Sequence, residues 1–231
     1  MKILLIGTGS MGKLMENELN TQHDIHSFAY STQIPDETYD IIVDFSHPDN
    51  LPGLNNYITN HPTPIIIGTT GYTPSQEQQI KNWATAMPVM LSYNFSIGIT
   101  LMNELLKQMT QTLSSTFDIE LVEKHHRRKI DAPSGTANML LSSINQELHY
   151  TLIHGRKGER LREDNEIGVH SLRAGTIDGE HEVIFAGEDE ILSIKHLAYS
   201  EMVFVKGAIK AINWLITQES GLYEMKDVLF G

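Results

Sequence analysis

The chain has 231 residues, 40% of them hydrophobic and 20% charged, which is typical of one large or two small globular domains rather than of a disordered chain. Its formal net charge of −12 argues against non-specific nucleic-acid binding, which depends on neutralising phosphates. It has no cysteine, which excludes disulfides and thiolate sites, and no apolar run near the ~18 residues of a membrane span. Because the amino terminus also lacks the features of a signal peptide, we expect a cytoplasmic protein that binds neither membrane nor nucleic acid.

The amino terminus starts with a strand-sized apolar run, Met1 to Ile6, followed directly by Gly7-Thr-Gly-Ser-Met-Gly12. This is the G-x-G-x-x-G pattern, and a helical pattern follows it over residues 13–19. In a dinucleotide fold the first glycine permits a tight turn, the second lets the backbone approach a pyrophosphate, and the third lets helix pack on strand. An ordinary strand-to-helix turn is the alternative, but the context favours a dinucleotide site.

Further strands are predicted at short intervals, over residues 24–30, 41–44, 64–67 and 88–91, with helical or loop segments at 49–59 and 74–86. Alternating strands and helices indicate a parallel sheet, and ligands bind beyond the carboxyl ends of its strands. Those ends are rich in small and hydroxyl residues: Gly7-Thr-Gly9, Asp44-Phe-Ser-His47, Gly68-Thr-Thr-Gly71 and Ser92-Tyr-Asn-Phe95. Turn chemistry explains any one of them, whereas four on one edge favour a binding crevice.

The strand after the first helix bears on the choice of cofactor, because an acid at its end usually binds the NAD ribose. Here it ends Phe28-Ala-Tyr-Ser-Thr32, without an acid. No arginine marks a site for the 2′-phosphate of NADP, and Lys13 is the basic side chain closest to the loop. The sequence leaves NADH and NADPH both open, with a lean toward NADPH.

A basic cluster follows a predicted helix over residues 99–112 and a predicted strand over residues 117–123. It contains Lys124, Arg127, Arg128 and Lys129, with His125 and His126 between them. A charge run of this kind is as often a solvated surface as a site.

The residues after the cluster suggest an anion site. Ser134, Gly135 and Thr136 lie at or just before the amino terminus of a helix predicted over residues 137–148. Free N–H groups and the helix dipole favour a carboxylate or phosphate there. A helix cap is the alternative, but a cap does not require the preceding cations. We therefore predict a small polyanionic substrate.

The remaining chain is strand-rich, with strands predicted over residues 151–154, 168–173, 181–185 and 190–198 and a final amphipathic helix over residues 203–216. The predicted fold is α/β. A Rossmann-type dinucleotide-binding domain spans residues 1–96 and is completed by 203–231. An α+β substrate domain spans residues 97–202 and has a mixed, mostly antiparallel sheet whose open face is suited to subunit contacts.

The stretch Glu123-Lys-His-His-Arg-Arg-Lys-Ile-Asp-Ala-Pro-Ser-Gly-Thr-Ala137 resembles the signature of the 4-hydroxy-tetrahydrodipicolinate (dihydrodipicolinate) reductase family of bacterial lysine and diaminopimelate synthesis. The glycine loop, Gly68-Thr-Thr-Gly71 and the segments 170–175 and 179–185 agree in order and spacing. Ser10 and Glu201 stand where arginine is common in the family. The resemblance implies an NAD(P)H-dependent reduction that yields tetrahydrodipicolinate, a cyclic dicarboxylate, by a homotetramer built through the substrate domains.

The resemblance also implies roles for individual residues. His125 matches the proton donor and Lys129 the second catalytic donor. His126, Gly135 and Thr136 match substrate contacts, and Ser134 joins them as part of the predicted anion site. The residues that match cofactor contacts are Gly7, Thr8, Gly9, Ser10, Met11, Gly12, Gly68, Thr69, Thr70, Ser92, Tyr93, Asn94 and Phe95.

Three other interpretations fit the sequence less well. A dehydrogenase acting on an aspartate-derived aldehyde would share the first half, but such enzymes often need a cysteine. A dinucleotide sensor without turnover would leave the His-His cluster unexplained. A metal site at His125 and His126 is disfavoured, because adjacent residues on a strand point to opposite faces.

Overall fold

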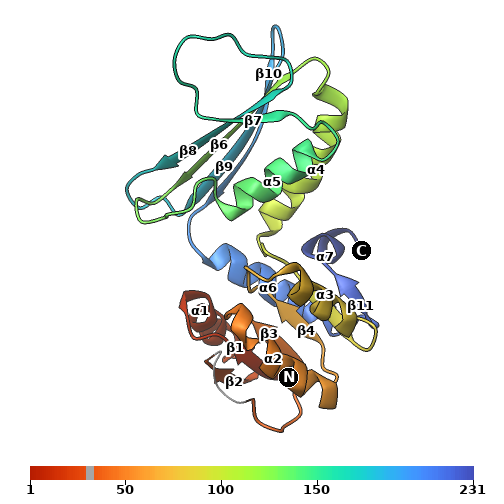
Figure 1. Cartoon of the computed structure of the whole chain (residues 1–231). Helices are drawn as coiled ribbons and strands as arrows, with labels where there is room; N and C mark the ends of the chain where they lie inside the picture. Colours follow the sequence, from red (N-terminus) through yellow and green to blue (C-terminus); the bar gives the residue numbers. More distant parts are fainter. Residues whose placement is uncertain (30–33) are drawn as a thin grey trace. The chain divides into compact units, whose positions relative to one another are not determined.

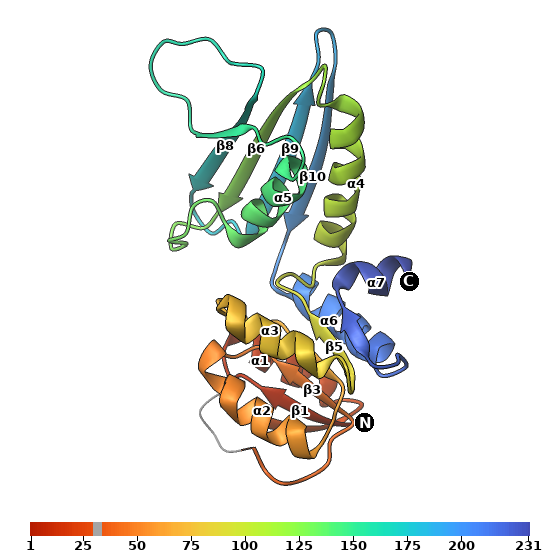
Figure 2. The same cartoon turned by 45° about the vertical axis from the view of Figure 1, so that its right-hand side comes forward.

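The structure, a computed structural model, describes residues 1–29 and 34–231. It divides into two compact units, shown in Figures 1 and 2. Unit 1 comprises residues 1–97 and 202–231, and unit 2 comprises residues 98–201. Among the described residues, no helix has the length and apolar character needed to cross a membrane.

Unit 1 is built on a six-stranded sheet in the order β11-β5-β4-β3-β1-β2, in which every pair is parallel. Its strands are β1 (Lys2–Ile6), β2 (Asp24–Phe28), β3 (Ile41–Asp44), β4 (Ile65–Ile67), β5 (Pro88–Leu91) and β11 (Gly221–Tyr223). Because both faces of such a sheet are covered, its central strands are continuous apolar runs, as in the buried Ile41–Val43. The predicted Rossmann-type sheet is confirmed.

Helices cover both faces of this sheet. One hydrophobic cluster joins it to α1 (Ser10–Leu19), α6 (Met202–Leu215) and α7 (Met225–Phe230), and the other joins it to α2 (Leu51–Asn60) and α3 (Pro74–Trp83). A short turn of 3-10 helix, η1 (Pro48–Asn50), precedes α2. The predicted final helix thus packs on unit 1, where it buries Val205, Ala208 and Ile212. The strand β2 ends at Phe28, two residues before the predicted end, and the predicted residues from Tyr30 to Thr32 lie outside the described chain.

Unit 2 contains a five-stranded sheet in the order β10-β9-β6-β8-β7. Its elements are α4 (Ile97–Leu113), which begins at the unit boundary, β6 (Asp118–His125), α5 (Gly135–Asn145), β7 (Thr151–His154), β8 (Glu166–Arg173), β9 (Gly179–Ala186) and β10 (Ile191–Ala198). The sheet is mixed, as predicted. However, β6 with β8 and β7 with β8 are parallel, so antiparallel pairs are half of the total and not most of it.

The strand β6 alternates between the two faces of this sheet. Ile119, Leu121, Glu123 and His125 are buried, whereas the residues between them are at least partly exposed. The buried face packs on α4 and α5, which lie over one side of the strands in Figure 2. Within the described part of unit 2, no helix lies on the opposite face. The period of two therefore directs Glu123 and His125 to the helical side of the sheet.

Candidate active site

The glycine loop of unit 1 fixes a close approach between β1, α1 and β3. Gly7 has φ +115°, and a Cβ there would lie 2.2 Å from the carbonyl oxygen of Phe45. A Cβ at Gly12 would lie 1.8 Å from the carbonyl oxygen of Gly7. Gly9, by contrast, is the N-cap of α1, has no side-chain cap, and would direct a Cβ into open space. The first turn of α1 therefore presents its N–H groups beside an unobstructed glycine.

Phe45 connects the ends of three neighbouring strands. Its ring lies where a Cβ of Gly68 would be, at 2.1 Å, and contacts the ring of Phe95 with centroids 5.3 Å apart. The carboxyl ends of β1, β3, β4 and β5 thus lie on one edge of the sheet.

The residues predicted to contact the cofactor differ in exposure. Thr8, Gly9, Ser10, Thr70 and Tyr93 are exposed, whereas Met11, Gly68 and Ser92 are half-buried. Gly7, Gly12, Thr69, Asn94 and Phe95 are buried. The side chain of Thr69 bonds to Asp44 and the ring of Phe95 contacts Phe45, so both stabilise this edge from within unit 1.

Asp44, for which the sequence predicts no role of its own, connects two loops of this edge. It is fully buried and accepts hydrogen bonds from the hydroxyl groups of Ser46, Thr69 (2.9 Å) and Tyr72 (3.3 Å). Thr69 Oγ1 in turn accepts the N–H of Ser46 at 2.8 Å. Burial raises the pKa of Asp44 to about 6, although the three hydroxyl groups oppose this shift. The only signal in the sequence was an acid at the end of a buried strand.

In unit 2, β6 places Glu123 and His125 beside Arg173 of β8. Glu123 is fully buried, and its carboxylate accepts two hydrogen bonds from Arg173, at 2.8 and 2.7 Å. Its Oε2 also lies 2.5 Å from His125 Nδ1. Burial alone would raise the pKa of Glu123, but the bonds from Arg173 and His125 lower it overall. Burial lowers the pKa of His125, against the effect of Glu123.

A second buried histidine lies beside the first. The rings of His181 and His125 meet edge to face, with centroids 5.1 Å apart. Nε2 of His181 lies 2.9 Å from Oγ of Ser134, which caps α5 by accepting the N–H of Ala137 at 3.1 Å. Burial, followed by the neighbouring His125, lowers the pKa of His181 to about 4.

The side chains of Glu123, His125, Arg173, His181 and Ser134 form one array, and Lys129 connects to this array through Asp131. Its ammonium lies 2.8 Å from Oδ1 of Asp131, whose backbone oxygen accepts a bond from Arg173 at 2.5 Å. Nδ1 of His126 is buried and, among the described residues, has no hydrogen-bond partner. Gly135 opens the first turn of α5, and a Cβ there would meet nothing within 4 Å. Cations, imidazoles and a helix amino terminus thus gather in one part of unit 2.

Not all cations of the basic run lie with these groups. Lys124 points to the opposite face of the sheet and pairs with Glu180 at 2.6 Å, and Arg127 and Arg128 are exposed. The reason is that β6 continues to His125, two residues beyond its predicted end, so the alternation of the strand separates Lys124 from His125. The helix α5 begins at Gly135, two residues before its predicted start, which places Thr136 in its first turn.

Three groups in the array had no predicted role: Glu123, Arg173 and His181. Each lies in a segment that carried the family resemblance, so a signal existed, but only the register of the sheet shows the contact. In the register of the sheet, His125 lies opposite Arg173 on β8, and Glu123 lies opposite His181 on β9. The described residues contain no group of three or more histidine or acidic side chains placed to hold a metal ion.

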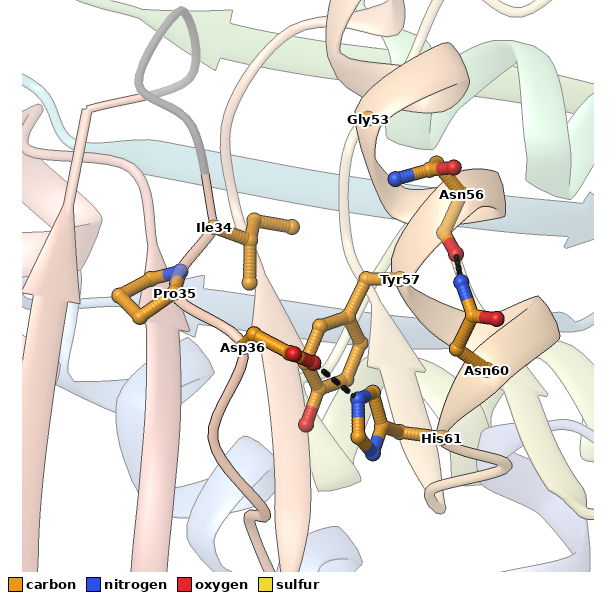
Figure 3. A pocket seen from close by; sticks show the side chains of 8 residues that line it. All are labelled: Ile34, Pro35, Asp36, Gly53, Asn56, Tyr57, Asn60 and His61. Atoms are coloured by element: carbon orange, nitrogen blue, oxygen red, sulfur yellow. Dashed lines mark hydrogen bonds and ion pairs between the residues drawn. The ribbon is translucent and has the colours of Figure 1, made fainter.

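A separate pocket of about 740 Å³ lies in unit 1 between α2 and residues 34–36 (Figure 3). His61 stacks on Tyr57 with centroids 4.9 Å apart and pairs with Asp36 at 2.6 Å. The side-chain amide of Asn60 bonds to the backbone oxygen of Asn56 at 2.9 Å. These groups bond to one another, and none belongs to the two sets described above.

Two models of one protein family together match most of the chain. The model described as "Dihydrodipicolinate reductase, N-terminus" matches residues 16–95, and "Dihydrodipicolinate reductase, C-terminus" matches residues 98–229. The first match begins beyond the glycine loop, so the interpretation of that loop depends on its own pattern and geometry.

Curated relatives and a solved structure agree with this match. A 4-hydroxy-tetrahydrodipicolinate reductase of Brachyspira hyodysenteriae is 41% identical and covers 99% of this chain and 100% of its own. One of Exiguobacterium sibiricum is 49% identical over 82% of this chain and 77% of its own. The dipicolinate-bound dihydrodipicolinate reductase of Paenisporosarcina sp. TG-14 has a TM-score of 0.77 at 22% identity, with 97% of each chain covered, which shows a shared fold.

Proposed function

The chain belongs to the dihydrodipicolinate reductase family, and we propose on that premise that it catalyses the NAD(P)H-dependent reduction of 4-hydroxy-tetrahydrodipicolinate to tetrahydrodipicolinate, in the cytoplasm, for lysine and diaminopimelate synthesis. The observation that carries the proposal is the array of Glu123, His125 and Arg173 beside the amino terminus of α5. It provides a proton-exchanging imidazole next to an anion site. A sensor that binds without turnover has no use for such an arrangement.

We assign the cofactor to unit 1. Its phosphates fit the first turn of α1, where Gly9 leaves open space and Gly7 and Gly12 fix the turn. The rest of the cofactor would be lined by the backbone of the other strand ends and by Thr8, Ser10, Met11, Thr70 and Tyr93. A bound nicotinamide cofactor supplies the hydride. The sequence after β2 provides no acid for the NAD ribose, so NADH and NADPH both remain candidates, with a lean toward NADPH.

We assign the dicarboxylate to unit 2. One carboxylate fits the N–H groups of the first turn of α5, at Gly135 and Thr136, where the helix dipole favours an anion. Ser134 holds that turn in place as its cap. We assign the ammonium of Lys129 and the imidazole of His126 as the donors for the second carboxylate.

We assign His125 and Lys129 distinct tasks in the reaction. Overall the reaction consumes one hydride and one proton: the hydroxyl leaves as water together with a proton from the neighbouring ring carbon, and the ring gains the hydride and one proton. His125 supplies the proton to the reduced ring, because an imidazole titrates near neutral pH. Lys129 stabilises the negative charge that develops on the ring and assists departure of the hydroxyl.

We also propose that the protein is a homotetramer assembled through unit 2. The face of its sheet opposite α4 and α5 carries partly exposed apolar side chains between charged ones: Val122, Leu172, Ile184 and Leu197. An uncovered face of this composition is suited to a second copy of the chain. Light scattering at several protein concentrations tests the assembly, and a monomer at all of them would contradict it.

The activity is tested by coupling the protein to the upstream synthase, with pyruvate and aspartate semialdehyde, and following NADH or NADPH oxidation. We expect oxidation that depends on both the synthase and this protein. Binding of the cofactor without oxidation would instead support the sensor.

A further inference from the structure

The carboxylate of Glu123 is held in one orientation by the side chain of Arg173. Both oxygens accept a hydrogen bond from the guanidinium, at 2.8 and 2.7 Å, in the two-pronged geometry that arginine and a carboxylate favour. Arg173 is itself anchored, since it donates to the backbone oxygens of Leu172 and Asp131. Glu123 is fully buried. Its Oε2 therefore has a fixed position, 2.5 Å from Nδ1 of His125.

We infer that Glu123 is a positioning residue for the proposed proton transfer. Held by Arg173, its carboxylate accepts a hydrogen bond from the Nδ1–H of His125. Nε2 is then the nitrogen that exchanges a proton with the substrate. This inference rests on the proposed function. It gives Arg173 a role as well, because without the clamp the glutamate side chain would be free to turn away from the imidazole.

The tautomer follows from the chemistry of the carboxylate. An ionised carboxylate can only accept hydrogen bonds, so a bond between Glu123 and His125 requires the proton to be on Nδ1. The bonds from Arg173 and His125 lower the pKa of Glu123 against the effect of burial, which keeps it ionised at neutral pH. In the neutral imidazole, Nε2 then carries the lone pair that receives a proton from solvent and passes it on.

The surroundings of Nε2 are consistent with this assignment. A Cβ at Gly179 would lie 3.3 Å from Nε2, so the glycine keeps that nitrogen clear of a side chain from β9. The next imidazole, that of His181, is occupied by its bond to Ser134. Neither neighbour competes for the Nε2 proton.

The charged and titratable groups that face His125 come from every element around it. Glu123 lies on its own strand, Arg173 on β8, His181 on β9 and Lys129 in the following loop; His196 of β10 lies behind His181. Burial lowers the pKa of His125, Glu123 raises it, and Lys129 and Arg173 lower it. Glu123 is thus the one group among these that favours the protonated imidazole.

The first experiment needs no turnover and no variant of Glu123. Nitrogen NMR of the full-length protein with labelled histidines, with the signal assigned through His125→Asn, reports which ring nitrogen carries the proton. At neutral pH we expect His125 with a protonated Nδ1 and a bare Nε2. A neutral imidazole with its proton on Nε2 would overturn the inference, even if the protein proves to be an active reductase.

The second experiment uses a double-mutant cycle. Glu123→Gln should lower kcat on the order of 10²-fold while KM for the dicarboxylate changes by less than about threefold, because only the proton donor is mispositioned. Glu123→Asp should lower kcat less than Glu123→Gln does, since it keeps the charge of the carboxylate. In the His125→Ala background, Glu123→Gln should cost less than about threefold, because there is no imidazole left to position.

Glu104→Gln is the matched control, because Glu104 pairs with Lys107 on α4, away from the array and from the open face of the sheet. It should leave kcat unchanged. An equal loss from Glu123→Gln with and without His125 would mean a purely structural role and would overturn the inference. Absence of reductase turnover in the wild type would overturn the proposed function alone, since the NMR experiment still decides the tautomer.

Discussion

Nε2 of His181 lies 2.9 Å from Oγ of Ser134, the residue that caps α5. The hydroxyl of Ser134 accepts the N–H of Ala137, which leaves its own proton for a second partner. Because burial and His125 lower the pKa of His181 to about 4, His181 is neutral at pH 7. We assign its Nε2 as the acceptor of a hydrogen bond from the Ser134 hydroxyl. One hydroxyl group therefore connects the first turn of α5 to β9.

Ser134→Ala tests this connection. We expect it to lower the free energy of unfolding by about 1–3 kcal/mol, because it removes the cap and leaves the acceptor of His181 without a donor. Ser142→Ala is the control, since Ser142 is exposed and donates only to the backbone of Asn138 within the same helix. Ser142→Ala should change the free energy of unfolding by no more than about 0.5 kcal/mol. Urea unfolding measures both, and equal effects would contradict the connection.

The pH dependence of stability tests the state of His181. The unfolded chain takes up a proton near the ordinary pKa of 6.5, whereas the folded chain does so only near 4. The contribution of the neutral imidazole is therefore complete above pH 6.5 and is lost as the pH falls toward 4, by up to about 3 kcal/mol. His181→Gln keeps an acceptor but does not titrate. The difference in Tm between wild type and variant should change across this window, and a constant difference would contradict the shift.

The sequence predicted most of the fold, because the buried strands of a parallel sheet are continuous apolar runs. Residues 41–44 and 88–91 are strands over the predicted range. The three residues of β11 were missed, since so short a segment has no periodicity and is a strand only through its pairing with β5. The parallel pairing of β6 and β8 was missed because it depends on the path of the chain and not on composition.

The site was predictable where its residues are close in sequence. His125, Lys129 and Ser134 lie within ten positions, and their spacing around a helix amino terminus indicated an anion site. Arg173 and His181 reach the same place from two other strands, and no pattern within either strand shows that. Lys124 belongs to the same basic run but lies on the other face, which became visible only with the full length of β6.

Lys129 and Lys124 allow a comparison within one basic run. Lys129→Ala should lower kcat by roughly 10²-fold or more, as should His125→Ala, because each removes a group that handles charge or the proton. Lys124→Ala should change kcat by less than about threefold, since its ammonium is directed to Glu180 on the opposite face. Steady-state kinetics with the coupled assay compares the three variants. A loss for Lys124→Ala as large as that for Lys129→Ala would contradict the division of the run.

Gly9 and Gly135 allow the two ligand sites to be probed without disturbing the fold. A Cβ at either position meets nothing within 4 Å, whereas one at Gly12 would lie 1.8 Å from a backbone oxygen. Alanine at position 9 or 135 therefore leaves the folded chain unstrained, and any defect reflects crowding of a bound ligand. We expect Gly9→Ala to raise KM for the cofactor by about tenfold and Gly135→Ala to raise KM for the dicarboxylate by about as much, each without loss of Tm.

These two glycine variants serve as controls for each other. Gly9→Ala should leave KM for the dicarboxylate within about threefold of wild type, and Gly135→Ala should do the same for the cofactor, because the two helix amino termini hold different ligands. Gly12→Ala should instead lower Tm, since its methyl group has no room beside Gly7. If either unstrained variant raised both KM values equally, the assignment of cofactor to α1 and dicarboxylate to α5 would be wrong.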